Sequence, residues 1–236
     1  MPPSVPDISV IVTLHQEGLL AEATLASAAR AAGVAARQGL SVHLLAVVDR
    51  PDELTRSVLE GWRSRLDVLE VHTGDVGLNR NAATASATAD FVAFLDGDDL
   101  WAPDWLSAAF AAAQAGPVRS VWHPEANLYF GEAGNESWFL QPDMEAPGFN
   151  RAIIELYNPW TALCFAPRAL FLDIPYPPSD LARGFGYEDW HWNLVTARRG
   201  VLHKIVPGTV HFIRQKPVSL MRRTTAAGAL MVPVPR

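Results

Sequence analysis

Three carboxylates lie within four residues, directly after an apolar run. The run covers residues 91–95 and is followed by Asp96-Gly97-Asp98-Asp99. Carboxylates this close raise one another's pKa unless a cation lies between them. Their oxygens suit Mg²⁺ or Mn²⁺, which commonly also bind phosphate oxygens and water. The segment therefore predicts a site for a divalent metal and a diphosphate. The alternative is a helix cap by Asp99 or Asp104, which explains only one carboxylate.

A second acidic pair, Glu188-Asp189, lies in a stretch, residues 184–199, that is expected to form a turn followed by a helix. A carboxylate beside another carboxylate and apolar walls can have its pKa raised into the range of a general base. The helix N-terminus opposes this shift, because it favours the anion. Tyr187 and Trp190 flank the pair and could form an aromatic wall beside it. The alternative is an acidic pair that only complements the helix dipole.

The elements that would position these residues alternate between strand and helix in the first half of the chain. Apolar, β-branched runs predict strands, and stretches of small residues without breakers predict helices. The alternation indicates an α/β fold, a mostly parallel sheet flanked by helices, whose ligands bind at the carboxyl ends of the strands. We expect strands at residues 8–14, 40–48, 68–72 and 91–95, and helices at residues 19–36, 52–66, 79–88 and 103–114.

The pattern changes after Gly116. Residues 117–180 are rich in tryptophan, proline and short polar turns, which favour short strands and long loops, and one or two further strands are expected within 201–212. Because no low-complexity linker or internal repeat interrupts the chain, we expect a single domain over residues 1–236. Its parts are a regular half at 1–115, an irregular half at 116–223 and a poorly ordered tail at 224–236.

The composition excludes several classes of protein. Of the 236 residues, 49% are apolar and 19% charged, which indicates a globular chain. The net charge of -6 argues against nucleic acid as a partner. The single cysteine, Cys164, excludes an internal disulfide and a cysteine-built zinc site. The sequence contains no signal-peptide pattern and no apolar run long enough for a transmembrane segment, so we expect a cytoplasmic protein; its oligomeric state is left open.

Two segments together are similar to a known family. Gly77-Leu78-Asn79-Arg80-Asn81, followed by the acidic segment within residues 89–103, resembles the glycosyltransferases of family 2, which have the GT-A fold. The resemblance implies an irregular acceptor-binding half at 116–223 and a nucleotide-binding half at 1–115. It implies transfer of a sugar from a nucleoside diphosphate, in the first place UDP, to a carbohydrate or other hydroxyl acceptor, with inversion and with Mn²⁺ or Mg²⁺ as cofactor.

The resemblance also implies roles for the acidic residues. Asp98 would hold the metal, and Asp96 would assist through the ribose or a metal-bound water. Asp189 would be the catalytic base that deprotonates the acceptor, with Glu188 beside it.

Further residues are expected to bind the nucleotide. Thr13, His15 and Glu17 lie in a turn that is similar to the family's nucleobase-binding turn, although His15 could also be an ordinary surface histidine. Asp49 matches an aspartate that binds the base or ribose, but Arg50 follows where the family commonly has a second aspartate. Arg80 could reach the base or phosphates, or could instead serve as an ion-pair partner on the surface.

The segment 211–219 departs from the family pattern. Alignment on Arg214 and Ser219 puts Lys216 where the family often has a metal- or diphosphate-contacting histidine. A charged lysine cannot bind a metal but can neutralise a diphosphate. His211 is then a competing metal ligand, and both residues could instead lie on the surface.

The acceptor would contact Trp160 together with Tyr187 and Trp190, although a buried core tryptophan is the alternative for Trp160.

Two other functions are possible for a chain with these motifs. A catalytically silent carbohydrate-binding or scaffold domain is disfavoured by the two intact acidic motifs. A sugar-phosphate nucleotidyltransferase would need a glycine-rich basic loop after the first strand, and the residues after Leu14 supply only one glycine and no lysine or arginine. No Gly-x-Gly-x-x-Gly follows a strand, which disfavours a dehydrogenase.

Overall fold

The computed structural model describes residues 5–131, 136–217 and 219–234. The first half alternates strands and helices, and the described part of the second half combines two long strands with short strands, three α-helices and two 3₁₀ helices. In chain order the elements are β1 (Ile8–Leu14), α1 (Leu20–Arg37), β2 (Val42–Asp49), α2 (Glu53–Trp62), β3 (Asp67–Val71), α3 (Val76–Ser86), β4 (Phe91–Asp96), β5 (Leu100–Trp101), α4 (Trp105–Ala115), β6 (Ser120–Phe130), β7 (Ser137–Leu140), η1 (Arg151–Glu155), β8 (Phe165–Pro167), α5 (Arg168–Asp173), η2 (Leu181–Arg183), β9 (Phe185–Gly186), α6 (Glu188–Arg198), β10 (Leu202–Arg214), α7 (Leu220–Ala226) and β11 (Leu230–Met231).

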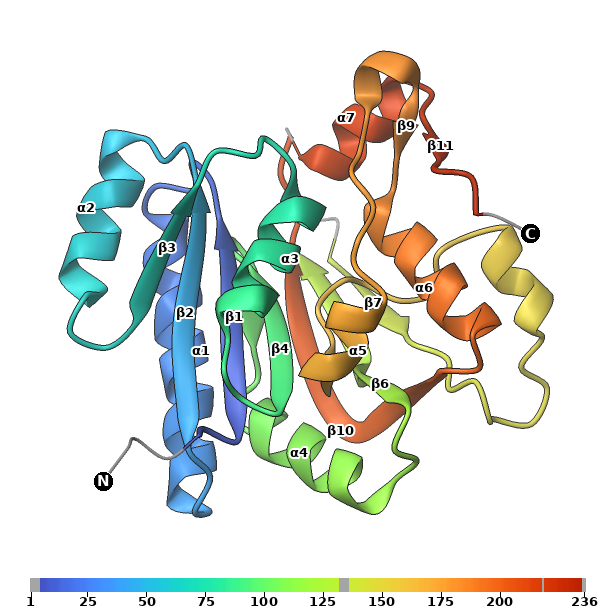
Figure 1. Cartoon of the computed structure of the whole chain (residues 1–236), viewed down its shortest axis with the longest axis horizontal. Helices are drawn as coiled ribbons and strands as arrows, with labels where there is room; N and C mark the ends of the chain where they lie inside the picture. Colours follow the sequence, from blue (N-terminus) through green and yellow to red (C-terminus); the bar gives the residue numbers. More distant parts are fainter. Residues whose placement is uncertain (1–4, 132–135, 218, 235–236) are drawn as a thin grey trace.

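The described residues form one nine-stranded sheet and a separate pair, β11 with β9. The large sheet has the order β3-β2-β1-β4-β8-β6-β10-β5, with β7 paired to β6 (Figure 1). Strands β3, β2, β1 and β4 are parallel neighbours, and β8 joins them to β6 in antiparallel fashion. The predicted α/β fold is confirmed. In the rest of the sheet β6 and β10 are also parallel, whereas β5, β7 and β8 run antiparallel to their neighbours.

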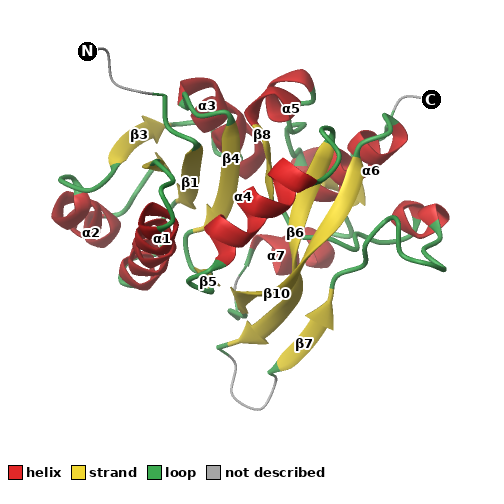
Figure 2. Cartoon of the chain, turned by 90° about the horizontal axis from the view of Figure 1, so that it is seen from below, coloured by secondary structure: helices red, strands yellow, loops and turns green. Residues whose placement is uncertain are grey.

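Helices cover both faces of the sheet (Figure 2). Helices α1 and α4 pack against one face, and α3, α5 and α6 lie over the other. The alternation of side chains along β1 follows this arrangement: Val10 and Val12 join the core that contains α1, whereas Ile11 joins the core that contains α3. The strand at residues 8–14 is therefore buried on both faces.

The sheet brings separate parts of the chain to one edge. In the parallel register Thr13 of β1 lies beside Asp96 of β4, and Leu14 lies beside Val48 of β2. The carboxyl ends of these three strands therefore meet, as expected for a ligand-binding edge. Asp49, the last residue of β2, lies at the same edge.

The described part of the tail, residues 224–234, contains the end of α7 and the short strand β11. Residues 220–226 form α7. Strand β11 pairs in parallel with β9, the short strand that precedes α6 in the sequence. The Ser219 side chain caps α7 by accepting from the Arg222 amide, a local signal that the tail is helical. Within the described part of the chain, none of the helices combines the length and the apolar character needed to cross a bilayer.

Candidate functional site

The acidic segment begins at the junction of β1 and β4. The Thr13 hydroxyl donates to Asp96 Oδ1 at 2.7 Å. At Gly97 the chain passes so close to β1 that an added Cβ would lie 2.7 Å from the Thr13 carbonyl oxygen and 2.5 Å from Leu14 Cδ2. The glycine within the acidic segment is therefore required by the close approach of this turn to β1.

Arg80 joins the acidic segment to the second acidic pair. Its guanidinium donates to Asp96 Oδ1 at 2.8 Å and to Glu188 Oε1 at 3.0 Å, and its side chain is only 2% exposed. These hydrogen bonds between charged groups are of the strong kind, and they hold β4 and α6 at a fixed separation. Of the two roles expected for Arg80, the structure shows the ion pair, inside the protein rather than on its surface.

Neighbouring residues of α3 hold Arg80 in place. Asn81 exchanges two hydrogen bonds with the backbone of Tyr176, each 2.9 Å long. Gly77 allows α3 to approach the following segment, because an added Cβ there would lie 3.0 Å from the Pro177 carbonyl oxygen. The contacts of Gly77 and Asn81 therefore fix α3 against the segment 176–177, and this packing keeps the Arg80 guanidinium buried.

The other two carboxylates of the acidic segment contact the end of β10 and the residues after it. Lys216 Nζ lies 2.6 Å from Asp98 Oδ2. The Arg214 backbone amide donates to Asp99 Oδ1 at 2.6 Å, and Arg214 Nε donates to the Asp98 carbonyl at 3.0 Å. Burial, with the charges of Asp98 and Asp96, raises the pKa of Asp99 well above its usual range. The predicted nucleotide residue Lys216 is thus brought directly to the predicted metal residue Asp98.

Asp189 lies in the first turn of α6, where both of its oxygens accept hydrogen bonds. Oδ1 accepts from the Trp190 amide at 2.8 Å, and Oδ2 accepts from Asn158 Nδ2 at 2.9 Å. Burial and the neighbouring Glu188 charge raise the pKa of Asp189 to about 7. A carboxyl with this pKa can both accept and release a proton near neutral pH.

The predicted nucleobase turn lies over the end of β2. His15 is exposed, and its Nδ1 donates to the Asp49 carbonyl; its backbone amide donates to Glu17 Oε2. Burial raises the pKa of Glu17. Asp49 Oδ2 accepts from the Gly74 amide at 2.7 Å, whereas its buried Oδ1 has no hydrogen bond among the described residues. His15, Glu17 and Asp49 are therefore grouped at one edge, as predicted, and their contacts with a nucleotide remain a prediction.

His211 lies apart from the carboxylates. It is fully buried, with its ring 4.5 Å from that of Trp105 and 5.9 Å from that of Trp101. Among the described residues, no group of three or more His, Cys, Asp or Glu side chains is arranged to hold a metal. In the described part of the chain His211 therefore does not join Asp96 and Asp98 in such a group, and the metal roles of all three residues stay predictions.

The aromatic residues expected at the acceptor divide into two sets. Tyr187 and Trp190 are half-buried beside Asp189, with their rings 5.9 Å apart at 75°. Tyr187 has φ 59°, an uncommon conformation for a residue with a side chain, directly before the acidic pair. Trp160 is only 2% exposed and stacks on His203 at 4.1 Å. Trp160 therefore lies in the core, where it offers no ring face to an acceptor.

Three further residues make contacts at the site that were not predicted from the sequence. Arg214 organises the acidic segment, Asn158 contacts Asp189, and Asn193 contacts Asn158. Asn193 is four residues after Asp189 on the expected helix, a spacing that places both on one face. Asn158 carries no comparable signal, because its partner is 31 residues away.

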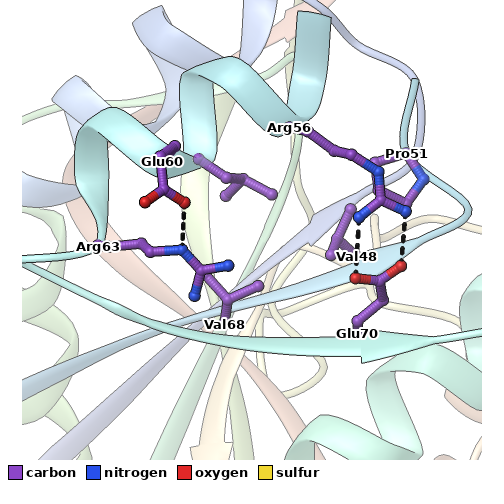
Figure 3. Close-up of a pocket in the computed structure, with 8 residues that line it drawn as sticks. Val48, Pro51, Arg56, Glu60, Arg63, Val68 and Glu70 are labelled. Carbon is purple, nitrogen blue, oxygen red and sulfur yellow. Dashed lines mark hydrogen bonds and ion pairs between the residues drawn. The ribbon is translucent and has the colours of Figure 1, made fainter. Parts of the chain in front are cut away.

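A separate pocket of about 160 Å³ lies between α2 and β3 (Figure 3). Its charged side chains pair with one another: Arg56 with Glu70 at 2.7 Å, and Arg63 with Glu60 at 2.5 Å. None of the predicted site residues lines it. Its charges are already matched within the pocket, so it is not the candidate site.

The chain is similar to known glycosyltransferases and polysaccharide biosynthesis proteins. The family model described as glycosyl transferase family 2 matches residues 9–171. Validoxylamine A glucosyltransferase of Streptomyces hygroscopicus subsp. jinggangensis (strain 5008) is 27% identical over 216 residues, which cover 78% of this chain and 48% of that protein. Succinoglycan biosynthesis protein ExoM of Rhizobium meliloti (strain 1021) is 37% identical over 82 residues, which cover 30% of this chain and 26% of that protein. The chain thus spans between about a quarter and about a half of these relatives.

Solved structures have the same fold. TarS 1-349 of S. aureus in complex with UDP-GlcNAc matches with a TM-score of 0.69 and 20% identity, over 92% of this chain and 60% of that one. The mannosyltransferase PcManGT from Pyrobaculum calidifontis, in complex with GDP-Man and Mn²⁺, matches with a TM-score of 0.60 and 18% identity, over 89% of this chain and 57% of that one. The predicted GT-A architecture is therefore confirmed.

The family model covers well over half of the 236 residues, including β1, the Arg80 helix and the acidic segment. The family predicted from these segments is confirmed, and the chain belongs to glycosyl transferase family 2.

Proposed function

We propose that this chain transfers a sugar from a nucleoside diphosphate donor to a hydroxyl acceptor, with inversion at the sugar carbon. The observation that carries the proposal is the buried Arg80 bridge, which links Asp96 at the sheet edge to Glu188, the neighbour of Asp189. A donor at the sheet edge and a proton acceptor at α6 are thereby held in one site. This is the arrangement that a displacement reaction needs, because both reactants must be oriented together.

The donor is proposed to be a UDP-sugar. The TarS structures include complexes with UDP-GlcNAc and with UDP, and the PcManGT structure contains GDP-Man. In this chain Asp49 Oδ1, which has no hydrogen bond among the described residues, offers an acceptor to an N–H of a base, and the exposed His15 ring offers a stacking face. Arg50 stands where the family commonly has a second aspartate, and its Nε lies 3.6 Å from Asp49 Oδ1. We propose that this replacement influences which nucleobase the chain binds.

A divalent metal fits the chemistry of the carboxylates. Asp98 would hold it, with Asp96 assisting, and diphosphate oxygens and water would complete its ligands. When bound, it supplies positive charge that stabilises the departing diphosphate. Lys216 supplies a second cation at the same place, and its long side chain can turn from Asp98 to a phosphate oxygen.

Asp189 is proposed to take the proton of the acceptor hydroxyl as that oxygen attacks the sugar carbon. With a pKa of about 7, a large part of the Asp189 population is ionised at neutral pH. Attack on the face opposite the diphosphate inverts the configuration. Tyr187 and Trp190, half-buried beside Asp189, are proposed to flank the acceptor.

The test begins with a screen of UDP-, GDP- and dTDP-sugars for binding by calorimetry and for nucleoside diphosphate release, with and without Mn²⁺. We expect binding and release with a UDP-sugar, with loss of release in Asp98→Asn. Glu60→Gln is the matched control, since Glu60 is an exposed acid on α2 that pairs with Arg63, away from the predicted site residues. Binding of every sugar nucleotide without release of diphosphate would favour a silent binding domain instead.

A further inference from the structure

Asn158 makes a hydrogen bond to the proposed base from the opposite side of the site. It lies in the loop after η1, and its Nδ2 donates to Asp189 Oδ2 at 2.9 Å. The other oxygen of Asp189 is held by the Trp190 amide of its own helix. The carboxylate is thus fixed at one oxygen by α6 and at the other by a side chain 31 residues earlier in the chain.

The orientation of the Asn158 amide follows from its second contact. Asn158 Oδ1 accepts from Asn193 Nδ2 at 2.8 Å, and Asn193 Nδ2 also lies 3.3 Å from the Trp160 carbonyl oxygen. Since an ionised carboxylate and a carbonyl only accept, the donors must be Asn158 Nδ2 and Asn193 Nδ2. Turning either amide around would place two oxygens against each other.

The loop that carries Asn158 is held by the protein core. Pro159 follows Asn158 and restricts its backbone to extended conformations. Trp160 comes next, is buried, and donates from its indole Nε1 to the Pro142 carbonyl at 2.8 Å. Trp160 also stacks on His203, whose Nε2 is 2.9 Å from Thr196 Oγ1 of α6. The same buried layer therefore ties the loop to the helix of Asp189.

Asn193 is itself fixed. It is 1% exposed and lies one helical turn after Asp189, so both side chains face the 158–160 loop. A buried amide with all of its donors directed at partners has little freedom to rotate. The two hydrogen bonds that join Asn193 to Asn158 and Asn158 to Asp189 therefore fix the Asp189 carboxylate relative to the protein core.

We propose that Asn158 is a positioning residue for Asp189: its amide fixes the direction of the carboxylate and stabilises its ionised form, leaving the remaining lone pairs for the acceptor proton. This rests on the proposed role of Asp189 as the base. A donor to a carboxylate favours the anion, so its loss raises the pKa of that carboxylate.

Other groups also act on Asp189 and set the background for this effect. Glu188 and Asp96 raise its pKa, and Arg80 lowers it. Burial raises the pKa values of Tyr129, Cys164 and Tyr176, so these three neighbours are neutral at pH 7. The titratable and charged groups that face Asp189 are Glu188 of its own helix, Arg80 of α3, Asp96 of β4, Tyr129 of β6, and Cys164 and Tyr176 of the connecting segments.

The test measures UDP-sugar turnover with water as the acceptor in Asn158→Leu and Asn158→Asp, across pH. We expect kcat at pH 7 to fall about 10- to 100-fold in Asn158→Leu, as for loss of a hydrogen bond to a charged group. The acidic limb of the profile should move to higher pH by about one unit or more in both variants, because both lose the donor. UDP affinity should stay at the wild-type value. Asn150→Asp, which changes an exposed asparagine of the same region in the same way but keeps a side chain that can cap η1, is the matched control for Asn158→Asp.

Two results would overturn the proposal. One is a kcat within about twofold of wild type in Asn158→Leu; the other is a reduced kcat whose acidic limb has not moved, which indicates a structural role alone. If the wild-type chain shows no turnover, the proposed function fails, and the positioning role is then decided by NMR titration of ¹³C-labelled aspartate. There the Asp189 carboxyl of folded Asn158→Leu must titrate at higher pH than in the wild type.

Discussion

Replacement of Arg80 by methionine removes one cation from between two carboxylates while keeping a long apolar stem. In the folded protein Arg80 donates to Asp96 and Glu188, and its guanidinium also lies 5.4 Å from the centre of the Tyr176 ring. The side chains of Arg80 and Glu188 are 2% and 8% exposed, so water cannot replace the lost partner. The variant leaves a buried carboxylate without its counter-charge.

The expected cost follows from these contacts. Removing one partner of a buried ion pair typically destabilises a protein by about 3–5 kcal/mol. Arg80 serves two carboxylates, but Asp96 is 32% exposed and keeps the Thr13 hydroxyl, so its share is the smaller. We therefore expect a loss of about 3–5 kcal/mol, which for a chain of this size corresponds to a fall in Tm of roughly 6–20 °C.

The measurement is urea unfolding at pH 7.5, followed by tryptophan fluorescence. Arg63→Met is the control, because its pair with Glu60 is exposed on both sides and should change the midpoint little. Arg80→Lys keeps the charge but cannot hold both carboxylates in the same fork, so it should fall between wild type and Arg80→Met. If Arg80→Met unfolds at the same urea concentration as Arg63→Met, the buried bridge contributes nothing and the reasoning is wrong.

Three further predictions concern the cations and the buried histidine. Asp98→Ala should abolish Mn²⁺-dependent UDP binding in calorimetry while circular dichroism stays unchanged; unaltered binding with metal rejects the metal role. Lys216→Ala should weaken UDP binding in EDTA by about 10- to 150-fold, the range for a charge-assisted contact, and equal affinities in EDTA contradict the diphosphate role. Burial lowers the pKa of His211 to about 3, so the unfolded chain binds more protons below about pH 6.5 and stability falls as pH decreases from there. His211→Phe should therefore reduce the pH slope of the unfolding free energy by about 1.4 kcal/mol per unit between pH 6 and 4, and an unchanged slope in urea titrations counts against burial of this histidine as the cause.

The first half of the fold could be predicted because its signals are local. Apolar runs such as residues 8–14 and 91–95 are long enough to identify buried strands, and α1 and α4 lie close to the alanine-rich stretches. Boundaries were less certain: α3 begins at Val76, three residues before the expected start, because Asp75 caps it by accepting from the Leu78 amide. The two-residue strand β5 exists only through its pairing with β10, which no local pattern announces.

The second half depends on contacts between distant segments. Strand β8 lies between β4 and β6, although it follows both in sequence, and its three residues have no periodicity to detect. Within the tail, β11 forms because it pairs with β9, a partner about 45 residues earlier. Small residues and prolines at 224–236 suggested poor order, since local propensity says nothing about such a partner.

The candidate site shows the same division. The sequence located the acids, because Asp96, Asp98 and Asp189 each lie beside a strand or helix that the pattern identifies. The sequence did not predict that Arg80 is buried, and it left open whether Trp160 lies in the core. The burial of these residues depends on the packing of α3 and of the 158–160 loop. The same residue types occur on surfaces and in cores, so only the assembled structure separates an arginine that binds a ligand from one that joins two carboxylates.

The measurement that tests the proposed function most directly is the turnover of Asp189→Asn, a variant that keeps the shape of the side chain and removes its basicity. With the UDP-sugar identified by screening, UDP release is followed from pH 5 to 9 for wild type and variant, and UDP affinity is measured alongside. We predict that wild-type kcat rises with pH around the Asp189 pKa of about 7, because the base must be ionised. The variant should lose about 10²- to 10⁴-fold in kcat and the pH dependence with it, with UDP affinity unchanged. Wild-type turnover in Asp189→Asn, with the same pH profile, would contradict a catalytic base at this position and leave Asp189 as a helix-terminal acid.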